Sequence, residues 1–269
     1  EKYVGRRGML PVAFLKALVR VGVRTPSWLF LYLLNLPLSL TSKLKYVREL
    51  PLYEAPTRFY FGEVTAILVA KEVNERARKN AELLKKVVGR VYIASSSPDG
   101  EDVITAREGK WVAISEALRR VEAERYLIID GDLPIDERSL MRLLSKEGDL
   151  IISRRAIDSR SIIDRILTRL FFLTTMLLFG NRYVDINAGA KVLGRRAREL
   201  ALDLNYHYLG DLILLIRARK SGLRVVEVPV YWIFDEPRTW RKRLRITLSI
   251  IRELFSLLVH RRVLSLNEE

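Results

Sequence analysis

The stretch YLIIDGDLP, from Tyr126 to Pro134, places two carboxylates directly after a short apolar run. The run is typical of a buried strand, and Asp130 and Asp132 emerge where that strand ends. Open α/β folds bind ligands at the carboxyl edge of their parallel strands. Mg²⁺ or Mn²⁺ is often shared between one or two carboxylates and substrate phosphates. The stretch therefore predicts a metal and diphosphate site; the alternative is that the acids only form the turn after the strand.

Strand-like and helix-like patterns alternate on both sides of this stretch, which predicts a mostly parallel sheet with helices on both faces. The predicted strands are Thr65–Ala70, Val91–Ala94, Tyr126–Ile129, Asp149–Ser153 and Arg224–Trp232. The predicted helices are Asn74–Val88, Lys110–Val121, Asp136–Leu144, Asp158–Phe179, Gly210–Ser221 and Arg238–Val259. We expect residues 51–237 to form one catalytic α/β domain, which includes an interfacial helix at 158–180.

The composition points to anionic partners. Lys and Arg total 47 against 32 Asp and Glu, a net charge of +15. This excess favours phosphates, acidic lipid head groups or nucleic acid as ligands. The chain contains no Cys, which excludes disulfides and thiol catalysis. It also contains no Gln, and the loss of heat-labile side chains favours a thermophilic source.

Residues 1–50 are predicted to associate with a membrane. They include an uncharged run of 18 residues, from Thr25 to Ser42, which is at the lower limit for crossing a bilayer. Because Asn35 and Pro37 interrupt its apolar centre, a tilted or re-entrant helix is as plausible as a full span. A buried core helix is the alternative.

Two further segments suit a membrane surface. In the helix at 158–180, Arg165 and Arg169 are one turn apart and precede an uncharged run. Residues 238–269 begin with a densely basic segment and continue as a mostly apolar helix. Basic residues beside an apolar helical face are attracted to anionic lipid.

Six segments, in order, resemble glycosyltransferase family 2, particularly its polyprenyl-phosphate glycosyltransferases of the dolichyl-phosphate mannose synthase type. They are AILVAKEVNE, REGKWVAISEAL, YLIIDGDL, DLIISRR, VDINAGAKVLGRRA and YLGDLILLIRARKSGLRVVEVPVYW. The resemblance covers roughly Val64 to Leu248 and implies the A-type glycosyltransferase fold, a Rossmann-like sheet flanked by helices. The residues it implies for donor binding are Asn74, Glu75, Gly109, Lys110, Asp130, Asp132, Ser153 and Arg154.

The same resemblance implies a metal-dependent, inverting transfer of a hexose. Asp130 and Asp132 would hold Mn²⁺ or Mg²⁺. Pro134 stands where synthase members often place Gln, and its ring offers a metal no ligand. GDP-mannose is the expected donor, by analogy with relatives from hot-living archaea, and UDP-glucose is the alternative. The acceptor would be dolichyl phosphate or a dolichyl-linked glycan.

The acceptor side of the site is expected to be basic. The resemblance implies that Arg165 and Arg238 bind the acceptor phosphate, with Arg169 beside them; the alternative for each, and mainly for Arg169, is that it only contacts lipid head groups. If the acceptor reacts through a sugar hydroxyl, Asp211 is the candidate base; the alternative is that Asp211 caps the helix beginning near Leu212. The expected location is the cell membrane, with the catalytic domain on the cytoplasmic side.

Two other protein classes fit parts of the sequence. A basic nucleic-acid-binding module explains the net charge, but it gives Asp130 and Asp132 no purpose, and no nucleic-acid motif is recognised. Nucleotidyltransferases share the sheet and the acid pair, but the Gly-rich basic loop of that class is absent after the first strand. We therefore expect no nucleic-acid partner.

Overall fold

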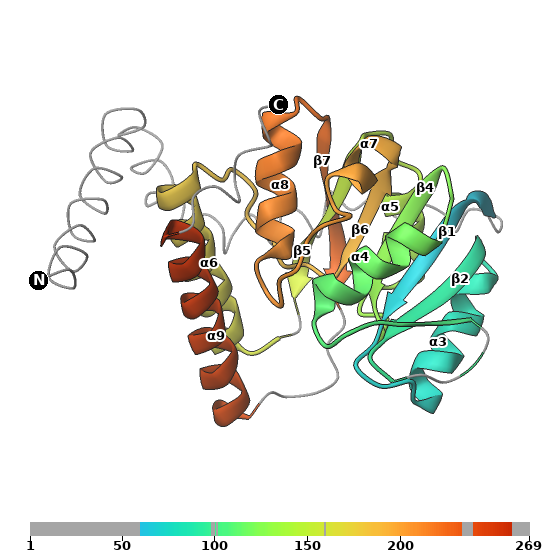
Figure 1. Ribbon diagram of the computed structural model, residues 1–269, viewed down its shortest axis with the longest axis horizontal. Helices are drawn as coiled ribbons and strands as arrows, with labels where there is room; N and C mark the ends of the chain where they lie inside the picture. Colours follow the sequence, from blue (N-terminus) through green and yellow to red (C-terminus); the bar gives the residue numbers. More distant parts are fainter. Residues whose placement is uncertain (1–59, 98–99, 101, 159, 233–238, 260–269) are drawn as a thin grey trace, which may run out of the picture. The chain divides into compact units, whose positions relative to one another are not determined.

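The computed structural model describes residues 60–97, 100, 102–158, 160–232 and 239–259. Within these ranges a seven-stranded sheet has the order β3-β2-β1-β4-β6-β5-β7 (Figure 1). Its strands are β1 (Phe61–Val69), β2 (Val88–Ser95), β3 (Val103–Thr105), β4 (Arg125–Asp130), β5 (Leu150–Asp158), β6 (Ala190–Gly194) and β7 (Val225–Trp232). Neighbouring strands are parallel except at β6, which runs antiparallel to both β4 and β5. The predicted mostly parallel sheet is confirmed.

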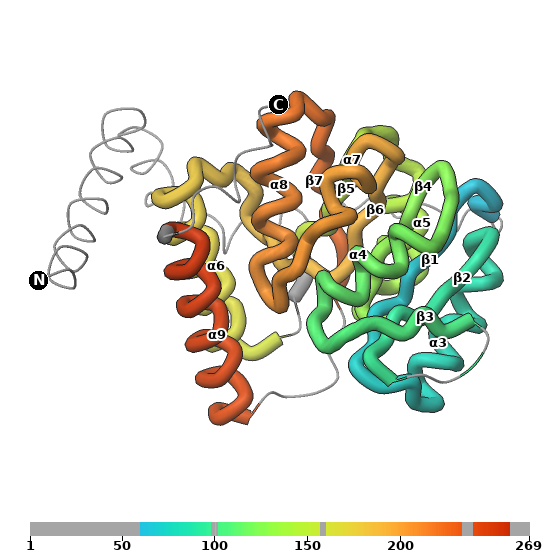
Figure 2. The backbone as a smooth tube through the Cα atoms, in the orientation of Figure 1, coloured from blue at the N-terminus to red at the C-terminus, as the bar shows by residue number. Residues whose placement is uncertain are grey.

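The helices are α3 (Glu75–Lys85), α4 (Lys110–Arg120), α5 (Glu137–Leu144), α6 (Ile162–Phe179), α7 (Arg195–Glu199), α8 (Gly210–Lys220) and α9 (Trp240–Val259). Val64, Ala66 and Leu68, on one face of β1, share a buried cluster with Leu84 of α3 and Leu140 of α5. The strands β2 and β3 lie on one side of β1, and β4 then lies on its other side. Because crossovers between parallel strands are right-handed, this reversal places α4 on the opposite face of the sheet from α3. Figure 2 follows this path from β1 through β4 in blue to green.

The helix α8 lies against α4. In the segment between α7 and α8, the carbonyls of Ala201 and Leu204 accept hydrogen bonds from Ser115 of α4, at 2.7 and 2.9 Å. The fully buried indole of Trp111 leaves no room for a Cβ at Gly210, the first residue of α8. Only glycine therefore permits this close approach of the two helices.

Every strand and helix predicted within the described ranges is present, with ends that shift by a few residues. The segments that were not predicted are β3, β6 and α7. Each has three to five residues, which is too short to display a period. In β6 the pattern is also broken by Lys191, which is buried.

The contacts divide the chain into two compact units. Residues Ile162–Val184, with α6, belong to one unit, and Ala55–Ser161 with Asp185–Glu269 form the other. No helix in the described part of the chain is both long and apolar enough to cross a bilayer. The helices predicted within residues 1–50 lie outside the described residues, as does Arg238.

A buried ion pair between Arg155 and Asp185 joins the two places where the chain leaves the sheet toward α6 and returns to it. Asp185 accepts from the backbone amide of Arg155 at 3.0 Å and is bound by both ends of its guanidinium. Arg155 also lies over the ring of Trp232, 5.0 Å from its centroid. Burial raises the pKa of the Asp185 carboxyl, but the Arg155 charge and hydrogen bonds outweigh burial and bring the pKa below its ordinary value.

We expect Asp185→Asn to lower the free energy of unfolding by about 3 kcal/mol at pH 7, because it removes one partner of a buried ion pair. Since the folded-state pKa of Asp185 is depressed, this stabilisation is present above the unfolded-state pKa of about 3.9 and is lost as the pH falls through the lower folded-state value. Urea unfolding at neutral and acid pH measures both effects.

The matched control is Asp203→Asn, which removes an ion pair with Arg217 whose acid is 67% exposed. Exposed pairs contribute less than about 1 kcal/mol. Equal losses in the two variants would contradict the importance assigned to the buried pair.

Candidate functional site

The site lies at the sheet edge where β1, β2 and β4 end and the antiparallel β6 begins. Asp130 is the last residue of β4 and pairs with Val69 of β1. Its amide donates to the carbonyl of Gly189 at 3.0 Å, and the amide of Gly131 donates to Val69 at 2.8 Å. The backbone of the acid motif is thus fixed from both sides.

The turn that carries the motif is held by a third segment. Asn80 of α3 donates from its side chain to the carbonyl of Gly131 at 2.9 Å. Leu133 closes the turn on Asp130 at 3.0 Å and has a φ of +47°, a conformation uncommon for a bulky side chain. Asn80 was not predicted from the sequence; its signal is a polar residue on the otherwise apolar buried face of α3.

Two lysine–aspartate ion pairs lie next to this turn. Lys110, the first residue of α4, lies 2.6 Å from Asp130. Lys191 of β6 lies 2.7 Å from Asp211 of α8, and also donates to the carbonyl of Ala188 at 2.6 Å. The Lys191–Asp211 pair is almost fully buried, whereas Lys110 and Asp130 are each about 30% exposed. We call these four residues the charge cluster.

The two aspartates of the cluster act on the pKa values of its two lysines. Burial lowers the pKa of Lys110, but the Asp130 charge, followed by that of Asp211, outweighs it and raises the pKa above its ordinary value. Burial dominates at Lys191, whose pKa is lowered despite its bond to Asp211. Because Lys110 stays cationic, it provides a positive charge beside the carboxylates at the exposed side of the site.

Asp132 lies at the exposed rim of the same edge. The surrounding protein partly desolvates its carboxyl, and this desolvation, followed by the Asp130 charge, raises the pKa of Asp132. A divalent cation would relieve this effect of the Asp130 charge on Asp132. No group of three or more acidic, His or Cys side chains suited to a metal occurs in the described ranges, so a metal here would rely on Asp130, Asp132 and ligand oxygens.

Gly189 provides the space for the Asp130 carboxylate. A Cβ at this position would overlap that carboxylate. Gly189 and Lys191 lie in VDINAGAKVLGRRA, a segment of the sequence resemblance that assigned neither of them a role. In the structure, one leaves room for the acid and the other neutralises Asp211.

The other predicted donor residues differ in how exposed they are. Asn74 is the exposed N-cap of α3, and its side chain accepts from Ala77 at 2.9 Å, with Glu75 following in the first turn. Gly109 precedes α4 with a φ of +135°, and His207 lies close to it. Ser153 is fully buried and donates to the carbonyl of Ala190 at 2.7 Å, so its hydroxyl serves the sheet. Arg154 is the next residue of β5 and is partly buried.

The predicted acceptor residues fall on other segments. Arg165 and Arg169 are both on α6, in the unit that contains Ile162–Val184. Asp211 does not cap α8: the N-cap position is Leu209, and Asp211 is in the first turn, ion-paired with Lys191. The capping alternative for Asp211 is therefore wrong.

Comparisons with known proteins agree on the fold. No family model and no curated protein matches the sequence. Among solved structures, glucosyl-3-phosphoglycerate synthase from Mycobacterium tuberculosis in complex with UDP is similar, with a TM-score of 0.54 and 18% identity over 72% of this chain and 79% of that one. Mannosyl-3-phosphoglycerate synthase from Rubrobacter xylanophilus gives a TM-score of 0.55 and 19% identity over 76% of both chains. A further structure of the mycobacterial enzyme, in complex with Mn²⁺ and UDP-glucose, gives 0.54 and 17% identity over 72% and 78%. At these identities the likeness establishes the fold, which is that of glycosyltransferases of the A type.

Gly189→Ala should displace the Asp130 carboxylate and cost about 1–3 kcal/mol of unfolding free energy. It should also weaken Mn²⁺ binding at least about tenfold, because the carboxylate no longer lies beside Asp132. Urea unfolding and electron paramagnetic resonance titration of Mn²⁺ measure the two effects.

Gly194→Ala, at the end of the same strand, is the control. Its φ is −79°, and an added Cβ would come no nearer than 3.4 Å to another atom. Equal Mn²⁺ affinities in the two variants would show that Asp130 does not bind the metal.

Proposed function

We propose that this protein is a metal-dependent, inverting glycosyltransferase that uses a nucleotide-sugar donor. The observation that carries the proposal is the position of the charge cluster. It combines Asp130, next to Asp132, with the cation of Lys110 at the ligand-binding edge of an A-type glycosyltransferase fold. The fold alone does not identify an activity, but these side chains supply the groups that a nucleoside diphosphate needs.

The donor diphosphate would bind between the acid pair and the start of α4. Asp130 and Asp132 would hold Mn²⁺ or Mg²⁺, which neutralises charge on the departing nucleoside diphosphate. Lys110 is a cation at the positive end of a helix dipole, an unfavourable place that an anion compensates. When the diphosphate arrives, Lys110 is already oriented by Asp130, and the N-terminal end of α4 favours a bound anion.

The state of Asp211 favours an acceptor that arrives ionised. Direct displacement at the anomeric carbon inverts its configuration and needs a nucleophile on the opposite side of the sugar. Asp211 is buried, and its Oδ1 already contacts Nζ of Lys191, 2.7 Å away, so it is poorly placed to take a proton from an acceptor. A phosphate is ionised at neutral pH and needs no base, so we propose a polyprenyl phosphate of the dolichyl type, bound by Arg165, Arg169 and Arg238.

The outer face of α9 supports a lipid-borne acceptor. Five large apolar side chains are each half exposed or more: Trp240, Leu244, Leu248, Ile251 and Phe255. At 100° per residue they fall within an arc of about 80°. We call them the apolar stripe. A contiguous exposed apolar surface marks a site of interaction with protein or membrane.

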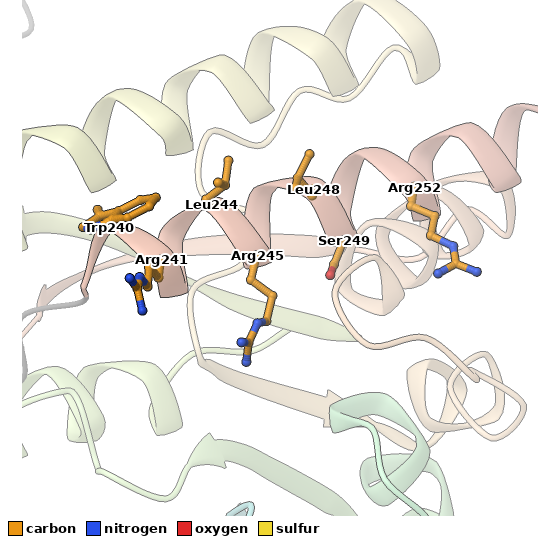
Figure 3. Close-up of a pocket in the computed structure, with 7 residues that line it drawn as sticks. All are labelled: Trp240, Arg241, Leu244, Arg245, Leu248, Ser249 and Arg252. Carbon is orange, nitrogen blue, oxygen red and sulfur yellow. The ribbon is translucent and has the colours of Figure 1, made fainter.

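Basic residues adjoin the apolar stripe. Arg241, Arg245 and Arg252 occupy the next arc of the helix and line a shallow pocket formed by α9 residues alone. Figure 3 shows Trp240, Leu244 and Leu248 on one side of α9, and Arg241 and Arg245 on another. Arginines beside an apolar stripe suit an anionic lipid surface. We therefore propose that the protein acts at the cell membrane, with its catalytic domain on the cytoplasmic side.

An alternative donor and an alternative acceptor need to be tested beside the proposed ones. GDP-mannose is the proposed donor, and UDP-glucose is the alternative, which is also the ligand named for one structural neighbour. Other structures of that mycobacterial enzyme contain phosphoglyceric acid. A phosphoglycerate is a phosphorylated acceptor without a lipid, so it belongs in the same assay.

The test incubates the protein with labelled GDP-mannose or UDP-glucose, Mn²⁺, and either dolichyl phosphate or 3-phosphoglycerate. We expect label in the organic phase with the lipid acceptor and its loss on chelation of the metal. Label transferred only to 3-phosphoglycerate would overturn the lipid proposal, and no transfer to either would overturn the activity. Asp132→Ala should lower the rate at least about a hundredfold without unfolding the protein, while Glu137→Ala, an exposed acid on α5, should leave it unchanged.

Membrane binding has a separate test. We expect the protein to float with phosphatidylglycerol vesicles and the emission of Trp240 to shift to the blue, with weaker binding to phosphatidylcholine. Leu248→Glu should reduce partitioning into the vesicles about tenfold, because it removes an apolar contact with the lipid. Leu83→Glu, at an exposed apolar position on α3, should have no effect. Equal flotation of the two variants would exclude the apolar stripe as the contact.

A further inference from the structure

Three consecutive backbone amides just before α8 converge on one carboxylate of α9. The amides of His207, Tyr208 and Leu209 donate to Glu253 at 3.1, 3.1 and 2.9 Å. Glu253 is the only acidic residue of α9, whose other charged residues are all basic. Successive amides form a concave anion site, and hydrogen bonds to an ionised acceptor are the stronger kind. Glu253 therefore fastens α9 to the loop that leads into α8.

The same loop touches the start of α4 on its other side. The carbonyl of Tyr206 accepts from the amide of Trp111 at 3.2 Å, and the Trp111 indole presses against Gly210. Trp111 directly follows Lys110 in the chain. The segment 206–210 thus contacts both Glu253 of α9 and Trp111, the neighbour of Lys110 in α4.

This segment sets the position of Asp211. Asp211 is two residues beyond Leu209, in the first turn of α8, and its carboxylate binds the buried Lys191 at 2.7 Å. Its charge also acts on Lys110. A shift of the first turn of α8 would move Asp211 relative to Lys110 and Lys191. Glu253 therefore affects the geometry of the charge cluster although it is not a member of the cluster.

We infer that Glu253 is a positioning residue for the active site: it holds the first turn of α8 so that Asp211 stays bonded to Lys191 beside Lys110. Glu253 itself contacts neither lysine in the described part of the chain. The helix that carries the apolar stripe is thereby tied to the charge cluster through backbone amides. The kinetic part of the test rests on the transferase activity proposed above; the exchange part does not.

Glu253→Gln is the informative variant. Glu253 uses Oε1 for His207 and Oε2 for the next two amides. Glutamine replaces one of these oxygens by an NH₂ group, which then faces an N–H donor, while the size of the side chain is unchanged. The control is Leu257→Val, which removes one methylene from a buried α9 residue and leaves the amide contacts intact.

Hydrogen exchange tests the contact without any substrate. We expect amides 207–209, and the amide of Ile213 that donates to the carbonyl of Leu209, to exchange about ten- to a hundredfold faster in Glu253→Gln, with the amides of β4 unchanged. In Leu257→Val the same amides should keep their protection. Unchanged exchange in Glu253→Gln would overturn the inference even if transfer is observed, and faster exchange would support it even if no acceptor is found.

Steady-state kinetics then separate positioning from general stability. In Glu253→Gln we expect kcat to fall at least about tenfold, because a small displacement of catalytic groups is costly. The donor KM should stay within about twofold, since Asp130 and Asp132 are held by other strands. Leu257→Val should change neither constant. An equal fall of kcat in both variants would mean that Glu253 only stabilises α9, and would overturn the positioning role.

Discussion

The close approach of β6 to the end of β4 is the constraint on which the site depends. β6 runs antiparallel between two parallel neighbours, so its first residues, rather than its last, lie at the ligand-binding edge. Gly189 leaves room there for the Asp130 carboxylate, and two residues later Lys191 neutralises Asp211. A parallel strand in this position would bring neither group to the acid motif.

The charge cluster balances burial against function. A buried ion pair gains little stability over an apolar pair of the same volume, so Lys191 and Asp211 are poorly explained as stabilising groups. For the proposed transfer, their value would lie in fixing charges before a ligand arrives, since preorganised charges need no rearrangement during the reaction. Lys110 and Asp130 form the exposed half of the cluster, where we propose that a phosphate binds.

The sequence predicted the fold and part of the site, and the reason differs for each residue. Apolar strands and long helices were visible because their periods extend over many residues, and the acid motif was visible because it ends such a strand. Asn80 and Glu253 were missed because each acts on the backbone of a distant segment, and no local pattern identifies that segment. Lys191 was matched by resemblance alone, since a lysine in a short apolar strand gives no sign that its partner is 20 residues away.

The contact between Arg155 and Asp185 has a consequence for how this fold changes over evolution. The chain leaves the sheet shortly after Arg155 and returns at Asp185, so the two ends of the intervening segment, Ile162–Val184, are joined by their own ion pair. An insertion whose ends already meet is replaceable without moving the strands around it. The segment with α6 is therefore a module whose length can change over evolution without moving the strand that carries the acid motif.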